Sequence, residues 1–365
     1  MGFYRNMKKL IIGVLIIFIL LLPLILWIIK PSTVLTIAVI DKTVPLQDYR
    51  EHNGLFWILE HYKIIKPDGE LYDIGRDYFG YDPYDQKANE SFHADRPLDL
   101  IYIADTYGVY NDDLKELPEG ERSKKLYGGM NLLEWNKIIE SKLATTTLIA
   151  EFNSFASPTD ETTRSVMEKN LGIKWSGWTG RYFDDLNNDD IPPWLIRNFE
   201  QQYEKKWMFD GAGLAFVHTS DKVIIVESNG TKENVTFQMT EQGLERFVEV
   251  QSSPYMYWFD IVAPIEGSSI LGEYELHISN EQKKILEDNG IPLNFPAIIH
   301  NQNNKTYYFA GDYADYKEKT FAKLLGIDRF LKVFANGDSD FYWSTYVPLM
   351  NKVLEQIIVE KEMKK

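Results

Sequence analysis

The feature that most constrains this chain is an uninterrupted apolar run near its N-terminus. Residues 10–29 read LIIGVLIIFILLLPLILWII and contain no charged side chain. An α-helix rises about 1.5 Å per residue, so this run spans about 30 Å, the thickness of the hydrocarbon core of a bilayer. Pro23 lies inside the run, and transmembrane helices tolerate proline better than soluble helices do. The run therefore predicts one membrane-spanning helix over residues 10–29.

The charges that flank the run predict its orientation. Arg5, Lys8 and Lys9 precede it, and Lys30 follows it closely. Basic residues are retained on the cytoplasmic side of a membrane. We therefore expect residues 1–9 in the cytoplasm and residues 34–365 outside it, as one extracytoplasmic domain of a single-pass protein of the cell membrane.

A cleaved signal peptide is the alternative interpretation of the same run. The apolar part of a signal peptide is usually about 7–15 residues long and ends in a small-x-small cleavage site. This run is longer, and the residues that follow it, Lys30-Pro31-Ser32-Thr33, contain no such site. An uncleaved anchor is therefore favoured. A lipoprotein is excluded because the chain has no cysteine to acylate.

Charge and cysteine content exclude several classes of function. Residues 1–31 hold four basic and no acidic residues, so the rest of the chain carries 35 basic and 54 acidic residues, a net charge of −19. Nucleic acid and anionic lipid headgroups repel such a domain, and no nucleic-acid partner is expected. The absence of cysteine removes disulfides, thiol catalysis and cysteine-ligated metals.

Strands and helices alternate along the first half of the domain. Apolar, β-branched runs predict buried strands at residues 34–40, 98–104 and 145–152. Helices are expected between and after them: one with Leu55, Leu59 and Tyr62 on a single face, one capped by Asn131 and Glu134, and one opened by Ser157 and ended near Gly172. This alternation predicts an α/β fold with a doubly wound, mostly parallel sheet of the flavodoxin-like or amidotransferase-like kind.

Residues 174–290 are expected to form an inserted α+β excursion from this sheet. The insertion contains a Trp-rich stretch at 174–185 without clear periodicity, a helix from Pro192 to about Trp207, strands at 213–218, 222–227, 235–239 and 257–263, and a short helix capped by Ser279 and Gln282. Strands at 296–300 and 306–310 follow it. A C-terminal helix closes the chain, with apolar residues from Tyr346 to Ile357 at helical spacing.

Acidic residues follow four of the predicted strands. Asp41, Asp105, Glu151 and Asp312 each stand where a strand ends, and Tyr107 and Asn153 accompany two of them. Ligands of open α/β sheets bind outside the carboxyl ends of the strands. We therefore expect the four acidic groups to converge on one ligand-binding cleft if the order of the strands permits. The alternative is that each of them caps a helix or bonds loop backbone.

The Trp-rich stretch supplies candidates for a rim or lid over this cleft. Trp175 and Trp178 offer flat surfaces of the kind that stack on sugar rings, and Arg181 could hold an acidic group. The alternative is that these aromatic rings pack a loop onto the sheet. If the protein is an enzyme, Asp105 and Glu151 are the candidate catalytic pair, because two opposed carboxyl groups suffice for glycoside hydrolysis.

Sharper motifs are missing from the chain. It has no G-x-S-x-G elbow, no H-E-x-x-H motif and no Walker A loop. Asp185 begins a pattern like a calcium loop, but Asp190 stands where glycine is needed and Ile196 where the bidentate glutamate should be. Neither a metal site nor a cofactor is expected.

The order of the elements resembles the class I glutamine amidotransferase-like superfamily. The segments that carry the resemblance are Ala104-Asp105-Thr106-Tyr107, residues 147–153, and Tyr308-Phe309-Ala310-Gly311-Asp312, within residues 34–170 and 295–355. In true amidotransferases a cysteine occupies the turn after the third of these strands, with a His–Glu pair nearer the C-terminus. Here that turn reads Glu151-Phe152-Asn153-Ser154, and Asn301 and Gln302 follow His300. The resemblance therefore implies the fold without glutaminase chemistry.

Members of the superfamily that lack the catalytic triad are often binding or scaffold domains. Together with the anchor, this predicts a membrane-anchored domain that acts on or with envelope glycans or a membrane-protein partner. The alternative is an envelope glycoside hydrolase that uses Asp105 and Glu151.

Overall fold

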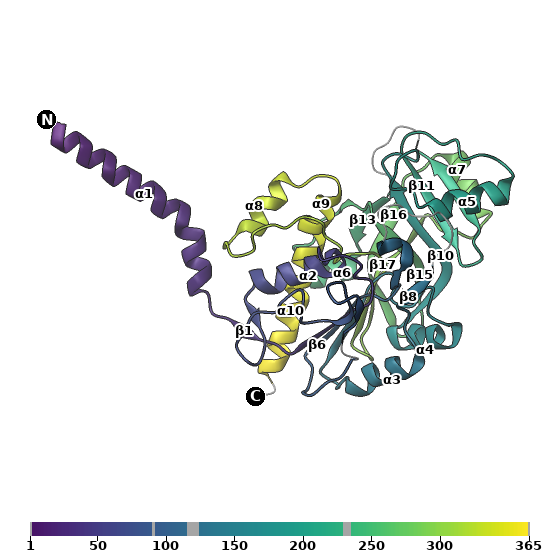
Figure 1. The fold of residues 1–365 in the computed structure, drawn as a ribbon, viewed down its shortest axis with the longest axis horizontal. Helices are drawn as coiled ribbons and strands as arrows, with labels where there is room; N and C mark the ends of the chain where they lie inside the picture. Colours follow the sequence, from purple (N-terminus) through teal and green to yellow (C-terminus); the bar gives the residue numbers. More distant parts are fainter. Residues whose placement is uncertain (1, 90–91, 115–123, 229–234, 364–365) are drawn as a thin grey trace.

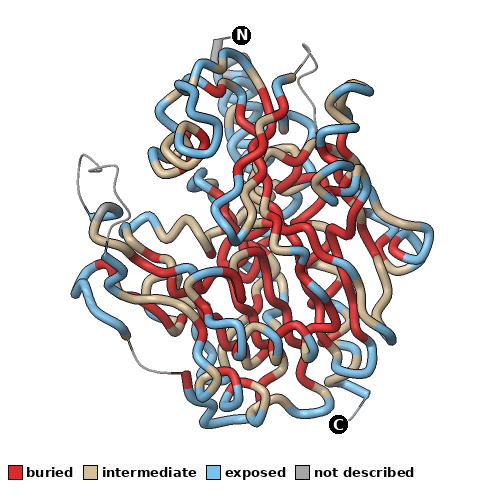
Figure 2. The backbone as a smooth tube through the Cα atoms, turned by 90° about the vertical axis from the view of Figure 1, so that its right-hand side faces the viewer, coloured by how far each residue is buried: buried red, intermediate tan, exposed pale blue. Residues whose placement is uncertain are grey.

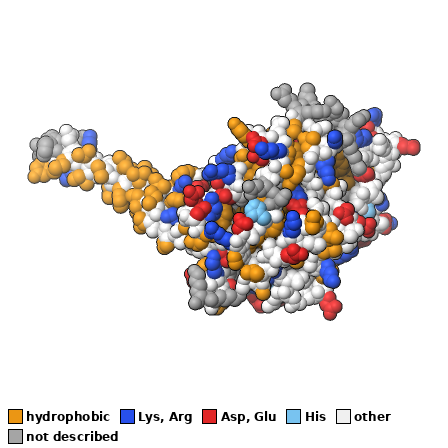
Figure 3. Space-filling view, turned by 60° about the horizontal axis from the view of Figure 1, so that its bottom comes forward, with side chains coloured by type: hydrophobic (Ala, Val, Ile, Leu, Met, Phe, Trp, Pro, Cys, Tyr) orange, Lys and Arg blue, Asp and Glu red, His pale blue; other side chains and the backbone are white. Residues whose placement is uncertain are grey.

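A single helix stands apart from the rest of the molecule. The computed structural model describes residues 2–89, 92–114, 124–228 and 235–363. Helix α1 (Gly2–Ile29) leaves the body as an isolated rod (Figure 1), and its side chains are largely exposed. Figure 3 shows this rod as an apolar surface beside a body that carries many charged side chains. The helix is long and apolar enough to cross a membrane, as the sequence predicts.

The body is built on one large mixed sheet of ten strands. Their order is β14-β13-β16-β17-β18-β9-β6-β2-β4-β5. Strands β18, β9, β6, β2 and β4 run parallel to one another, and the remaining pairs are antiparallel. The strands are β2 (Ile37–Asp41), β4 (Phe79–Asp82), β5 (Lys87–Ala88), β6 (Leu100–Asp105), β9 (Thr147–Ala150), β13 (Val235–Met239), β14 (Ser253–Pro254), β16 (Ser268–Leu276), β17 (Asn294–Asn301) and β18 (Thr306–Phe309).

Helices cover both faces of the parallel strands. Helices α2 (Arg50–His61) and α10 (Val347–Glu362) contact each other on one side, and α3 (Leu132–Ser141) and α4 (Glu161–Leu171) contact each other on the other side (Figure 1). Because both faces are covered, β2, β6, β9 and β18 are buried along their whole length. Figure 2 shows the buried strands at the centre of the body, where residues such as Val39, Ile101 and Leu148 are fully buried.

A second, four-stranded antiparallel sheet has the order β12-β11-β10-β15. Its strands are β10 (Ile173–Phe183), β11 (Gly213–His218), β12 (Val223–Glu227) and β15 (Trp258–Pro264). Helix α5 (Pro193–Tyr203) packs on it through Leu195 and Phe199. The strands expected at 213–218 and 222–227 are present and pair as an antiparallel hairpin. Residues 174–290 therefore contribute to both sheets, because β13, β14 and β16 extend the large one.

Three strands of this region were not predicted: β10, β16 and the two-residue β14. The Trp-rich stretch forms β10. Its sequence lacks a regular strand pattern because a bulge between Trp175 and Thr179 interrupts the alternation of inward and outward residues. Strand β16 lies inside the large sheet, yet it contains Ser268, Gly272 and Glu273, with register shifts on both sides of Gly272. Polar residues and irregular register remove the period-two pattern on which strand prediction depends.

Helix caps follow the sequence at most positions. The Asn131 side chain accepts a hydrogen bond from the Glu134 backbone N–H at 3.0 Å, and Ser279 and Gln282 form the predicted capping box of α7 (Asn280–Glu287). The predicted cap at Ser157 is wrong. Helix α4 begins three residues later, where Asp160 accepts from the Thr163 N–H at 3.0 Å.

The remaining elements are short. They are β1 (Thr33–Val34), β3 (Ile64–Ile65), β7 (Val109–Tyr110), β8 (Lys125–Tyr127), a 3-10 turn (Asn111–Leu114), α6 (Glu241–Arg246), α8 (Ile327–Phe334), α9 (Asp338–Phe341) and a π-helical turn (Tyr342–Tyr346) that leads into α10.

Candidate ligand site at the strand ends

Four acidic residues lie at the carboxyl ends of four neighbouring parallel strands. The order β18-β9-β6-β2 places Asp312, Glu151, Asp105 and Asp41 in succession along one edge of the sheet. Asp41 and Asp105 are direct partners in the register of β2 and β6. Burial raises the pKa of Asp312 well above its usual range, and the neighbouring carboxyl groups of Asp315, Asp105 and Glu151 raise it further. The predicted residues therefore form one electrostatic cluster.

Asp41 is bound into the fold. Its Oδ2 lies 2.6 Å from His52 Nδ1, and its Oδ1 accepts the Thr43 backbone N–H at 2.9 Å. The other ring nitrogen of His52 lies 3.0 Å from the Ile74 carbonyl oxygen. Because Asp41 and His52 are both fully buried, this pair holds α2 against the end of β2 and is closed to solvent.

Asp105 is held by hydrogen bonds and has a shifted pKa. Its Oδ1 accepts from the Thr43 hydroxyl at 2.7 Å and from the Tyr107 backbone N–H at 2.6 Å. Burial, with the charge of Asp41 beside it, raises the pKa of Asp105 to about 8. Asp105 is therefore mostly protonated at neutral pH, and a protonated carboxyl group can donate a hydrogen bond as well as accept one.

Glu151 is fully buried, and both of its oxygens have partners. Oε1 accepts from the Tyr102 hydroxyl, and Oε2 accepts from the backbone N–H groups of Tyr313 at 3.2 Å and Ala314 at 3.1 Å. Burial raises the pKa of Glu151 well above its usual range. Glu151 thus ties the end of β9 to the loop that follows β18, and it offers no free oxygen to a substrate.

Asn153 occupies the sharp turn after β9. Its φ of 63° lies in the left-handed region, which asparagine enters more readily than most residues. Its side chain hydrogen-bonds Asp105, and its backbone bonds Asp260 of the second sheet. This is the turn to which the resemblance assigns the amidotransferase cysteine, and an amide there is not a nucleophile.

Three charged residues that the sequence analysis did not single out complete the cluster. Arg50 and Glu51 begin α2, and Asp315 lies three residues after Asp312. Arg50 Nη2 is 2.8 Å from Asp315 Oδ2. Burial raises the pKa of Glu51 well above its usual range, with Asp41 and Asp315 adding to the shift, and burial also raises the pKa of Asp315. For Arg50 and Glu51 the only local signal was charge in the first turn of a helix that follows a strand, and Asp315 lies in a loop.

Part of this group lacks hydrogen bonds within the protein. Arg50 Nε, Glu51 Oε2 and Asp315 Oδ1 are buried and have no partner among the described residues. A buried polar atom left without a partner costs about 1–3 kcal/mol. Unlike the oxygens of Glu151, these atoms therefore have hydrogen-bonding capacity that the described residues do not use.

The structure separates the predicted aromatic rim from the cluster. Trp175 and Trp178 are only 8% and 6% exposed, and the Trp175 indole N–H donates to the Trp178 carbonyl oxygen at 3.0 Å. Their rings pack in the interior and present no open stacking face. Arg181, from the same strand, lies over the ring of Trp258 at 5.7 Å, and its charge acts on Asp315. Tyr107 is partly exposed and packs against Tyr110 at 4.8 Å.

Within residues 2–89, 92–114, 124–228 and 235–363, no group of three or more His, Asp or Glu side chains is arranged to hold a metal ion. The cluster combines carboxyl groups of raised pKa with two guanidinium groups. Such a set can accept hydrogen bonds from hydroxyl or ammonium groups, and protonated Asp105 can donate one.

Comparisons with known proteins give little further guidance. No protein-family model and no curated protein matches the chain. Among solved structures, a ThuA-like protein from Bacteroides uniformis ATCC 8492 is similar over 85% of this chain and 96% of its own, with 11% sequence identity and a TM-score of 0.34. A likeness at that level carries no argument about fold or function.

Proposed function

We propose that this chain is a membrane-anchored, extracytoplasmic binding domain of the cell envelope. Its strand-end cluster takes a hydroxyl-rich envelope glycan or a polar segment of a membrane-protein partner. The fold is of the flavodoxin-like or amidotransferase-like kind, without amidotransferase chemistry. The strand order supports this fold, because the five parallel strands, numbered along the chain, are arranged 2-1-3-4-5. The basic residues before the apolar run support the orientation.

The observation that carries the proposal is the set of buried atoms without partners. Glu51 Oε2 and Asp315 Oδ1 lie among residues that converge from α2 and from the loop after β18, at the edge where α/β sheets bind ligands. Hydroxyl groups of a ligand would supply the missing hydrogen bonds. Arg50 and Arg181 reduce the negative charge and supply donors for the oxygens of the ligand.

The geometry does not favour the glycoside hydrolase. A hydrolase of that class needs two carboxyl groups that flank the scissile bond, one as acid and the other as nucleophile or base. Glu151 is fully buried, and both of its oxygens bind the protein. Asp105 has the raised pKa of a general acid, but Glu151, the carboxyl group predicted to act with it, is not available.

Binding experiments on the full-length protein in detergent test the proposal. Wild type would be applied to an array of envelope glycan fragments, and partners would be captured in parallel by crosslinking in intact cells. We expect Glu51→Ala and Asp315→Ala to weaken the recovered interaction about tenfold each, because each removes an acceptor of the ligand. Asp189→Ala is the matched control, since Asp189 is exposed and lies outside the cluster.

Two results would overturn the proposal. The first is that wild type binds neither a glycan nor a partner. The second is that the cluster variants bind as well as Asp189→Ala does. Unfolding curves of all variants, recorded in the same detergent, separate a loss of binding from a loss of structure.

A further inference from the structure

The outer end of α1 is fastened to the body instead of joining it through a free linker. The Trp27 indole N–H donates to the His61 carbonyl oxygen at 3.0 Å, and Trp27 is buried. Lys63 Nζ donates to the carbonyl oxygens of Ile28 at 2.7 Å and Lys30 at 2.8 Å. The position of the body relative to the rod is therefore defined by direct contacts.

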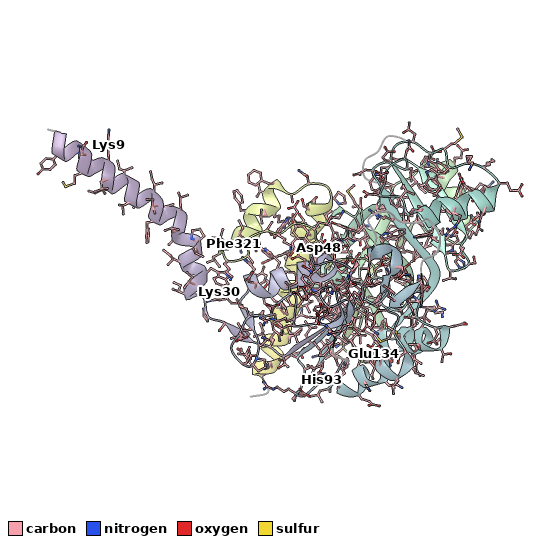
Figure 4. The ribbon with its side chains drawn as sticks, in the orientation of Figure 1. Lys9, Lys30, Asp48, His93, Glu134 and Phe321 are labelled. Carbon is pink, nitrogen blue, oxygen red and sulfur yellow. The ribbon has the colours of Figure 1, made fainter. Side chains whose placement is uncertain are left out.

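The segment after residue 317 lies beside this end of α1. The Leu325 backbone N–H donates to the Pro23 carbonyl oxygen at 3.1 Å. Phe321, labelled in Figure 4, lies near the end of α1 that carries Lys30. Helix α8 follows Leu325 directly, and Figure 1 shows it on the side of the body from which α1 emerges.

Helix α8 exposes apolar side chains. Ile327 and Leu331 pack against the core, whereas Phe330, Val333 and Phe334 point to the outside. Phe321 and Leu325, just before the helix, are also exposed. An exposed group of large apolar side chains on a water-soluble surface is unfavourable, and it marks a surface that something else covers.

The position of this segment along the axis of α1 indicates that a membrane covers its apolar side chains. Pro23 lies six residues before Ile29, the last residue of the helix, which places it about 9 Å inside the end of the apolar run. Helices that lie in the interface of a membrane bury their apolar face about 5–10 Å into the boundary of headgroups and acyl chains. When α1 crosses a bilayer, the start of α8 lies at that depth.

The charge of the segment agrees with a lipid surface. Residues 317–334 contain five basic residues and two acidic ones, although the rest of the domain is strongly acidic. The basic residues are Lys317, Lys319, Lys323, Arg329 and Lys332. Basic residues beside an apolar face are the usual composition of an interfacial helix, because they attract the anionic headgroups around it.

We propose that residues 317–334 form a second membrane contact, in which Phe321, Phe330, Val333 and Phe334 insert into the leaflet on the side of the body. This goes beyond the proposed binding function. It rests on α1 crossing a membrane and on no property of the strand-end cluster. The repulsion expected between the acidic domain and anionic lipid is thereby replaced locally by attraction.

A single fluorescent label tests the proposal, because the chain has no cysteine of its own. The full-length protein carrying Val333→Cys would be labelled with an environment-sensitive fluorophore and reconstituted into vesicles of phosphatidylglycerol and phosphatidylcholine. Val359→Cys is the matched control, a valine that is also exposed but lies near the C-terminal end of α10 (Figure 1). Brominated lipids and aqueous iodide serve as quenchers.

We expect brominated lipids to quench the label at position 333 about twofold or more, and the label at 359 hardly at all. Iodide should show the reverse order. Adding Phe330→Ser and Phe334→Ser to the Val333→Cys protein should lower its quenching by lipid. Equal access of iodide to both labels would overturn the proposal. A label at 333 that is shielded from iodide but not quenched by lipid would overturn it too, because a protein would then cover this face.

Discussion

The strand-end cluster and the segment 317–334 depart from ordinary protein structure in opposite ways. The cluster buries carboxyl groups where apolar side chains would give a more stable interior, and the segment exposes apolar side chains where charge would give a more soluble surface. Departures of this kind concentrate where a chain serves function instead of stability. The two regions also differ in how they are held. The cluster lies at the ends of the central strands, whereas α8 is held on the body by the partly buried Ile327 and Leu331 and by Asp328, which contacts His61 and Tyr62.

The cluster itself divides into two groups of carboxyl groups. Asp41 and Glu151 have their oxygens bound by the protein, and they fasten helix and loop to strand. Glu51 and Asp315 each keep a buried oxygen without a partner among the described residues. The lesson is that gathering at strand ends does not by itself make a residue part of a site.

The largest expected effect tests whether Glu151 stabilises the fold and is not part of the ligand site. Glu151→Ala removes the acceptor of the Tyr313 and Ala314 N–H groups and of the Tyr102 hydroxyl, and all three donors are buried. We expect the free energy of unfolding to fall by about 3–5 kcal/mol. Urea unfolding of the full-length protein in a mild detergent, followed by circular dichroism, measures it.

Glu151→Gln is the control for that change, because its amide oxygen still accepts from the two N–H groups. It should cost less than Glu151→Ala. If Glu151→Ala is as stable as wild type but loses the ligand, Glu151 belongs to the site, and the division drawn within the cluster is wrong.

A smaller effect is expected for the pH dependence of stability at Asp105. The pKa of Asp105 rises from a usual value of 3.8 to about 8 in the fold, so the folded state binds a proton that the unfolded state has released. The stability from this group is fully present below about pH 4 and is lost as the pH rises to about 8. Asp105→Asn should reduce this slope by up to about 1.4 kcal/mol per pH unit.

Unfolding curves at about pH 5, 6 and 7 measure the slope. The amide introduced by Asp105→Asn keeps an oxygen for the Thr43 and Tyr107 donors, so the hydrogen bonds of the turn remain. The exposed control Asp189→Asn should leave the slope unchanged. A slope that is identical in wild type and Asp105→Asn would show that Asp105 is ionised in the fold.

The smallest effect is expected on α8, where a polar substitution should cost almost nothing. Val333 is 77% exposed, so Val333→Ser should change the free energy of unfolding by no more than about 0.5 kcal/mol. The same substitution at Val353, which is 1% exposed on α10, should cost about 2–4 kcal/mol. Both are measured by urea unfolding in detergent. A large loss at Val333 would mean that α8 stabilises the body, and the contrast between the two regions would then disappear.

Four of the five parallel strands, β2, β6, β9 and β18, could be predicted, and with them the positions of the four acidic residues, whereas β4 was not predicted. Apolar runs that end in Asp41, Asp105 and Glu151 predict buried strands, and the carboxyl ends of parallel strands meet at one edge of the sheet. Glu51 and Asp315 could not be predicted, because a charged residue in a first helical turn or a loop is usually exposed. The tertiary fold pairs Asp315 with Arg50 and brings Glu51 close to Asp41 and Asp315.

The aromatic residues show a second limit of the sequence. In the sequence, Trp175 and Trp178 resemble the aromatic residues of a sugar-binding rim. Only the pairing of β10 with its neighbouring strands shows that they face the interior. The sequence of α8 is ambiguous in the same way. Apolar residues at helical spacing read the same whether they pack on a core or on lipid, so the exposure of Phe330 and Phe334 had to come from the structure.

The bond between the Leu325 N–H and the Pro23 carbonyl, with the contacts of Trp27 and Lys63, has a mechanical consequence. A domain on a flexible tether samples many orientations, whereas these contacts fix the body relative to α1. With α1 across a membrane, as we propose, the body can only rotate about α1 and diffuse in the plane of the membrane, so its strand ends stay at a constant height. A partner anchored in the same membrane would then meet them at a raised effective concentration.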